Sequence, residues 1–274
     1  MKSTIIKRIM AFLILIFCTV AISACSTQSQ KLSNTKEELS LKAEIKANKK
    51  KWNNKVKNVP IINYPKFDSS SESIEDDHLN FSLQLIKGLK DSNLNESTFF
   101  NKNTVINATV INFEEMKGKV IGPTTEVTIL VNKVLSGGKS LEGRRIKTEF
   151  GGGLTKVKYV YSDFEGNYHG NDHGYSDPNT QVFAATQAFP MPKIGDKIVT
   201  QVVNFSTISK GQRENYKTMY KLTSKNFYPI RDPYVLFWIK KGDKYQPNNP
   251  GFAHIQNDEI NKITNRINTI MSKK

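Results

Sequence analysis

The residues best suited to chemistry gather in one segment, Tyr161 to Asp177, which reads YSDFEGNYHGNDHGYSD. It holds two of the four histidines of the chain, and acids surround both of them. Imidazole and carboxylate ligands together suit a zinc or manganese ion. One hypothesis is therefore a divalent metal site made from His169, His173, Asp163 and Asp172.

Glycines interrupt this segment at Gly166, Gly170 and Gly174. Because glycine disfavours a helix, the two histidines are not predicted to share a helical face, and a loop would have to fold around the metal. The alternative is a long polar loop between strands, where binding residues are often found. We expect no resident cofactor, and a divalent metal is the alternative.

A second candidate surface combines aromatic rings with positive charges. It consists of Tyr216, Tyr220, Lys217, Lys221 and Arg231. Rings that stack and cations that attract phosphate are the groups with which barrel-like β domains bind oligosaccharides or oligonucleotides. If the segment is a strand, alternation sends part of this set into the core, which is the alternative interpretation.

Motifs of the common enzyme classes do not occur in the sequence. There is no Gly-x-Ser-x-Gly elbow and no His-Glu-x-x-His helix. Gly138-Lys139-Ser140 has the end of a phosphate-binding loop, but Lys133 stands where that loop requires its first glycine. We therefore expect a protein that is not an enzyme.

The N-terminal 25 residues have the organisation of a targeting segment. Lys2, Lys7 and Arg8 precede an apolar run from Ile9 to Ile22, and Ile22-Ser23-Ala24-Cys25 closes the run. This apolar run is shorter than the roughly 20 residues that a membrane-spanning helix requires. The tetrapeptide resembles the lipobox of bacterial lipoprotein signal peptides.

That resemblance implies that residues 1–24 are removed and that Cys25 is joined to diacylglycerol by a thioether. Acyl chains such as palmitate would then hold the protein on the extracytoplasmic face of the cell membrane, since two chains give a stable anchor. The other cysteine, Cys18, lies in the removed segment. The mature fold is thus expected to have no disulfide and no cysteine ligand for a metal.

Charge and composition change after the anchor. Residues 25–60 are rich in lysine and poor in aromatic residues, and we interpret them as a tether. Its charge either attracts anionic lipid headgroups or wall polymers, or belongs to a solvated spacer with no partner. Residues 61–274 are interpreted as a single globular domain. The whole chain carries a net charge of +15, but export makes nucleic acid an unexpected partner.

Apolar periodicity in this domain predicts mainly β structure with flanking helices, an α+β fold. Helices are expected over 71–89 and, as an amphipathic helix, over 257–274. Strands are expected near 105–113, 127–135, 145–150, 156–161, 197–205, 216–222 and 234–240. Short strands joined by glycine turns favour a small antiparallel OB-like barrel or sandwich.

Four segments carry a resemblance to a family, and they read NTVINATV, TEVTILVNKVLSG, RIKTEFGG and IGDKIV, starting at Asn103, Thr125, Arg145 and Ile194. Their order resembles Gram-positive lipoproteins and secreted proteins with netrin-like, OB-type barrel modules. The resemblance covers Leu94 to Lys240 and implies a fold, not an activity. The cysteine with which inhibitor modules of this type chelate a protease metal is absent, so inhibition is not implied.

Three functions follow as hypotheses. The preferred one is a non-enzymatic, membrane-anchored lipoprotein that binds an anionic wall polymer, a peptide or a protein. The second is a metal-binding lipoprotein that uses the loop of His169 and His173. The third is a structural assembly lipoprotein that docks through its C-terminal helix.

Overall fold

The structure is a computed structural model that describes residues 36–63, 95–101, 104–115, 123–162, 167–186, 189–220, 226–253 and 257–273. The chain divides into two units, 1–47 and 48–274. In the first unit, the described residues 36–47 are helical. The expected helix over 71–89 and the expected lipidation site Cys25 lie outside the described residues.

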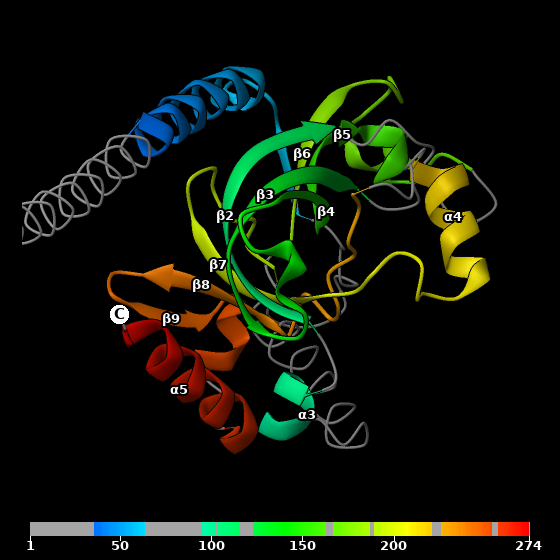
Figure 1. Ribbon diagram of the computed structural model, residues 1–274. Helices are drawn as coiled ribbons and strands as arrows, with labels where there is room; N and C mark the ends of the chain where they lie inside the picture. The colour runs from blue at the N-terminus through cyan, green and yellow to red at the C-terminus, as the bar shows by residue number, and fades with distance from the viewer. Residues whose placement is uncertain are drawn as a thin grey trace, which may run out of the picture. The chain divides into compact units, whose positions relative to one another are not determined.

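The second unit contains a six-stranded sheet with the order β4-β3-β2-β7-β8-β9, in which all neighbours are antiparallel (Figure 1). Its strands are β2 (Thr104–Glu115), β3 (Thr124–Ser136), β4 (Arg145–Gly151), β7 (Lys197–Val202), β8 (Phe237–Lys241) and β9 (Lys244–Pro247). A smaller sheet has the order β1-β6-β5 and consists of β1 (Ile61–Asn63), β5 (Gly153–Lys156) and β6 (Gln181–Ala185). β1 runs parallel to β6, and β5 runs antiparallel to it.

Glycines join the two sheets where β4 ends and β5 begins. Gly152 and Gly153 have φ angles of 87° and 109°, which lie in the region that side-chain-bearing residues avoid. Thr125 Oγ1 donates a hydrogen bond to the Gly152 carbonyl at 2.8 Å, and the Gly152 amide donates to the carbonyl of Pro123 at 2.8 Å. The chain thereby leaves the large sheet and enters the small one within three residues.

Both faces of the large sheet are covered. Because neighbouring residues of a strand point to opposite faces, Phe237 and Trp238 of β8 belong to different cores. Phe237 packs edge-on against Phe150 and Phe189, whereas Trp238 packs against Phe99. Burial on both sides explains why seven consecutive residues of the central strand β2 are buried.

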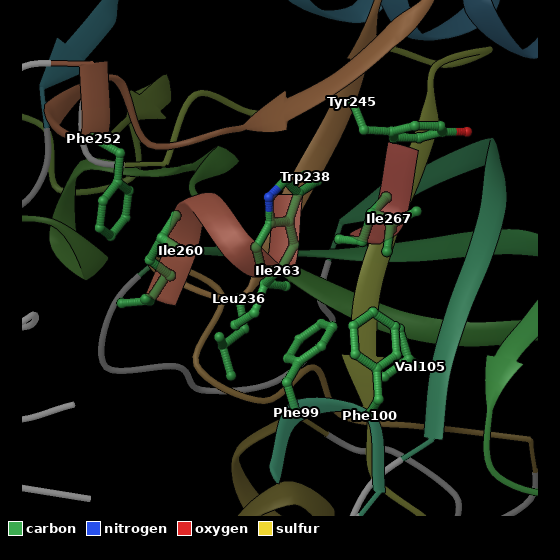
Figure 2. Packing of buried hydrophobic residues seen from close by; sticks show 12 residues of the cluster. Phe99, Phe100, Val105, Leu236, Trp238, Tyr245, Phe252, Ile260, Ile263 and Ile267 are labelled. Carbon is green, nitrogen blue, oxygen red and sulfur yellow. The ribbon is translucent and has the colours of Figure 1, made fainter. Parts of the chain in front are cut away.

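Two helices form the layer over the Trp238 face, α3 (Glu96–Asn101) and α5 (Asp258–Ser272). Figure 2 shows Ile260, Ile263 and Ile267 of α5 directed at the same cluster as Trp238. The Asn257 side chain caps α5 by accepting hydrogen bonds from the amides of Glu259 and Ile260. The expected C-terminal amphipathic helix is confirmed, and its apolar face is part of the core.

Polar side chains of α5 also hold the β8–β9 hairpin. Trp238 Nε1 donates to Thr264 Oγ1 at 2.8 Å. The Asn268 amide group bonds both backbone groups of Tyr245 in β9, accepting from its N–H at 2.8 Å and donating to its carbonyl at 3.0 Å. In Figure 1, α5 runs beside β9.

A short segment, 226–231, forms hydrogen bonds with two strands of the large sheet that are not neighbours, β4 and β7. Its residues donate and accept backbone hydrogen bonds at Lys147 of β4 and at Gln201 and Val203 at the end of β7. These are isolated bridges, not a strand, so the α+β fold is sandwich-like and its sheets are open. The strand order shows two open sheets and not the closed barrel that the sequence left as one alternative.

Two expected strands differ in the structure. Residues 216–222 were expected as a strand, but they overlap the helix α4 (Lys210–Tyr220). The reason is a capping box, since Ser209 Oγ accepts from the Gln212 amide and Gln212 Oε1 accepts from the Ser209 amide. Residues 156–161 were also expected as a strand. Instead, β5 ends at Lys156, and the 3-10 helix η2 (Val157–Tyr159) follows it.

Two further 3-10 helices lie in connections of the second unit, η1 (Lys139–Leu141) and η4 (Pro250–Ala253), and a fourth, η3 (Gly170–His173), lies in the histidine segment. The predicted half-buried strand 145–150 is confirmed as β4. Ile146, Thr148 and Phe150 are buried, and the residues between them are less buried.

Candidate functional site

The most concentrated charge among the described residues lies on a helical segment that precedes β1. Residues 48–56 are helical, and between Asn48 and Pro60 the sequence contains five lysines and no acid. We call these five residues the lysine cluster. They are Lys49, Lys50, Lys51, Lys55 and Lys57, and all five are exposed.

Contacts of Trp52, Asn48 and Pro60 fix the segment that carries the lysine cluster to the rest of the second unit. Trp52 is only 7% exposed, and its ring meets Phe113 of β2 edge-on at 5.3 Å between ring centroids. Asn48 Nδ2 donates to the carbonyl of Ile111 at 3.1 Å. After the helix, the Pro60 carbonyl accepts a hydrogen bond from the amide of Phe183 in β6. The five charges therefore project from a fixed part of the domain.

Exposed like charges that are fixed close together raise the local positive potential and attract polyanions. They repel one another as well, and the burial of Trp52 offsets part of that cost. The sequence placed these residues in a tether that ends at residue 60, whereas the compact unit begins at Asn48. Trp52 is the one tryptophan in this lysine-rich segment, and it was the signal in the sequence that the segment packs against the domain.

The described residues of the histidine segment, 161–162 and 167–177, lie between β5 and β6 of the small sheet. The amides of Val157 and Lys158 donate to the carbonyls of Thr180 and Pro178, which closes the base of the loop. His169, Asp172 and His173 lie in or next to η3, and all three are exposed.

The His173 ring stacks on Tyr161, with 4.2 Å between ring centroids and 23° between planes. The Tyr168 hydroxyl donates to the Tyr175 carbonyl at 2.7 Å, which ties the loop to itself. Within the described residues, no group of three or more His, Cys, Asp or Glu side chains is arranged to hold a metal ion. Asp163 is not among those residues, so the four-ligand hypothesis stays a prediction.

The aromatic and basic residues of the second candidate surface are divided between α4 and a bend. Tyr216 packs against Phe205 and Phe227 instead of standing on an open face. Lys217 is exposed and forms an ion pair with Glu214 at 3.3 Å. Arg231 is exposed beside Asp232 at 3.4 Å. Neither the Tyr220 side chain nor Lys221 is described.

A group that the sequence did not single out lies beneath Tyr216. The Tyr216 hydroxyl donates a hydrogen bond to Glu149 Oε1 of β4. Burial raises the pKa of Glu149 to about 7, although the hydrogen bond from Tyr216 lowers it in part. On the neighbouring strand β3, Glu126 stands opposite Glu149 and forms an ion pair with Lys147. A perturbed carboxyl at such a contact is a candidate for function.

None of the described helices is both long enough and apolar enough to cross a membrane. Comparison of the chain with protein-family models, with curated proteins and with solved structures finds no match.

Proposed function

We propose that the protein is a lipid-anchored, non-enzymatic binding protein of the cell envelope, and that the lysine cluster binds an anionic wall polymer. One observation carries this proposal: five exposed lysines lie on a helical segment and on the turn that follows it, and Trp52 fixes this segment to the domain. A polymer with regularly spaced phosphates offers several negative charges to such a surface at once.

The energetics favour a polymer over a small anion. An exposed ion pair contributes about 0 to 1 kcal/mol, so one or two phosphates would be held weakly. A chain of phosphates engages all five lysines after a single loss of translational freedom, and its affinity rises accordingly. Because the charges are exposed, this binding is expected to weaken as salt concentration rises.

The third hypothesis, docking through the C-terminal helix, has less support from the structure. Ile260, Ile263 and Ile267 of α5 are buried in the core of the chain itself. The apolar face on which docking would depend is therefore covered by α3 and the large sheet. The lysine cluster is exposed, and for this reason we prefer it as the binding surface.

Calorimetric titration of the purified chain with poly(glycerol phosphate) at two salt concentrations tests the polymer proposal. Replacing the five lysines of the cluster by glutamine is expected to weaken binding at least about tenfold and to flatten its salt dependence.

The matched control replaces five exposed lysines elsewhere, Lys193, Lys197, Lys241, Lys244 and Lys273, by glutamine. Both variants lose the same net charge. If both bind the polymer with equally reduced affinity, the attraction comes from net charge and the proposed site is wrong.

The anchor is tested through the two cysteines. In a Gram-positive host, Cys25→Ser is expected to move the protein from the membrane fraction and the detergent phase into the aqueous phase, because no diacylglycerol can be attached. Cys18→Ser is the control and is expected to stay in the membrane fraction. Equal partitioning of the two variants would refute anchoring at Cys25.

A further inference from the structure

Residues 48–60, the lysine segment, carry the lysine cluster and contact β2 at a β-bulge. In the register of β2 on β3, Val110 and Asn112 face consecutive residues, so Ile111 between them has no partner on that strand. The pairing of β2 with β7 ends at Thr109 and gives Ile111 no partner either. A bulged residue of this kind interrupts the hydrogen-bond ladder and changes the direction of the strand.

The lysine segment meets this bulge with one face of its helix. Asn48 and Trp52 are four residues apart and therefore lie on the same helical face. Asn48 Nδ2 donates to the carbonyl of Ile111 at 3.1 Å, and the Trp52 ring meets Phe113 edge-on at 5.3 Å between centroids. The segment thus bonds the residue that β3 and β7 leave without a register partner.

Phe113 connects this contact to the interior of the domain. Its side chain is buried, its ring lies 6.1 Å from that of Phe150 in β4, and Phe150 packs edge-on against Phe237. Trp52 is therefore the outermost member of a series of ring contacts that continues into the core. If the lysine segment left the sheet, Trp52 and part of Phe113 would lose this burial.

The composition of the segment works against a stable helix. It contains five lysines and no acid. Like charges four residues apart, as at Lys51 and Lys55, destabilise a helix, and Asn53 and Asn54 are poor helix formers. Without its contacts with the sheet, this part of the chain is therefore expected to be a weak helix whose lysines spread over many conformations.

We propose that docking of the lysine segment on the bulge of β2 and binding of the anionic polymer are coupled, with Asn48, Trp52 and Phe113 as positioning residues. A polymer that binds the docked segment finds the charges already ordered, whereas binding to a free segment includes the cost of ordering it. Because coupling is reciprocal, bound polymer strengthens docking in turn. This regulation rests on the proposed polymer binding by the lysine cluster.

Amide hydrogen exchange of residues 49–56 in the full chain measures docking. Saturation with poly(glycerol phosphate) is expected to raise the protection of these amides. Asn48→Ala removes one hydrogen bond between segment and sheet, so its protection is expected to be about 2- to 10-fold lower than that of Asn53→Ala. Asn53→Ala is the matched control, because Asn53 is an exposed asparagine of the same helix and its replacement makes the same change of helix propensity.

Calorimetric titration with the same polymer measures the other side of the coupling. Trp52→Ala and Phe113→Ala change no charge, but both remove the ring contact, and we expect each to weaken polymer binding about 3- to 10-fold and to reduce its salt dependence. Phe113→Leu keeps an apolar contact and is expected to retain more of the affinity. Ile263→Ala disturbs the core on the other face of the sheet, and its affinity is expected to stay at the wild-type value.

The outcomes separate the coupling from the polymer binding on which it rests. If the wild-type chain binds the polymer and both ring variants bind it equally well, the coupling is wrong and polymer binding stands. Equal protection of residues 49–56 with and without bound polymer would also overturn the coupling. If the wild-type chain does not bind the polymer at all, polymer binding itself is wrong and the coupling is lost with it.

Discussion

Gly153 occupies the position at which the chain passes from the large sheet into the small one. A Cβ atom built there would lie 1.8 Å from Thr125 Oγ1, and the φ angle of 109° is itself unfavourable for any other residue. The neighbouring Gly152 is equally confined, because a Cβ atom would lie 2.6 Å from the Ala184 carbonyl oxygen. The crossing between sheets thus depends on two residues that lack side chains.

We expect Gly153→Ala to lower the free energy of unfolding by about 2 to 4 kcal/mol, since it adds backbone strain to a steric overlap. Urea denaturation of the full chain measures the change. Gly138→Ala is the matched control, because Gly138 has a φ of −71° and open space around its Cβ position. It is expected to change stability by less than about 1 kcal/mol. Equal effects of the two substitutions would contradict this account of the crossing.

At the scale of residues, the local sequence pattern predicted which side chains of a strand are buried, but it did not predict contacts between residues far apart in the chain. A strand was correctly expected over residues 145–150, where Ile146, Thr148 and Phe150 alternate with charged residues and are buried. The same alternation puts Glu149 on the other face of the strand, where Tyr216, 67 residues later, donates a hydrogen bond to it. Residue spacing within one segment does not indicate a contact with a residue so far away in the sequence. The same limit applies to Tyr216, which the sequence offered either as a binding residue or as a core residue and which packs against Phe205 and Phe227.

At the scale of elements, α5 is a structural part of the domain. Ile263 is fully buried beside Trp238, whereas Ile270, near the end of the helix, is only partly buried. The cap at Asn257 and the ion pair of Arg266 with Glu96 at 2.8 Å set where the helix begins and which side faces α3. The isoleucine spacing alone predicted this helix, because its period is uniform from end to end.

We expect Ile263→Ala to destabilise the full chain by about 2 to 5 kcal/mol, through lost burial and the cavity left behind. Ile270→Ala is the control on the same helix and is expected to cost clearly less. Urea denaturation followed by tryptophan fluorescence compares the two, since Trp238 lies in the affected core. Similar small effects for both would mean that α5 is not a part of the core.

α4 shows where prediction of elements failed. Residues 216–222 were expected as a strand, although Tyr216 and Tyr220 stand four residues apart, which is a helical spacing, and Ser209 and Gln212 have the spacing of a capping box. The cap decides the outcome locally, because it satisfies amides that a helix start leaves without partners.

At the scale of the whole molecule, the sequence correctly predicted an α+β fold with short antiparallel strands and a C-terminal helix. It did not predict that the lysine-rich segment joins the fold. Trp52 and Phe113 are far apart in the chain, so their contact leaves no periodic pattern in the sequence. The consequence for function is large, because the same lysines are a diffuse tether in one interpretation and a positioned surface in the other.

The hydrogen bonds between Asn268 and Tyr245 affect the tendency of separate molecules to aggregate through their sheet edges. β9 is the last strand of its sheet, and the outward N–H and C=O of an edge strand are a template on which another chain can extend the sheet. In this fold, the side-chain amide of Asn268 already bonds both groups at Tyr245, as a neighbouring strand would. α5 thus blocks edge-to-edge aggregation at that position and protects the protein where many copies crowd together.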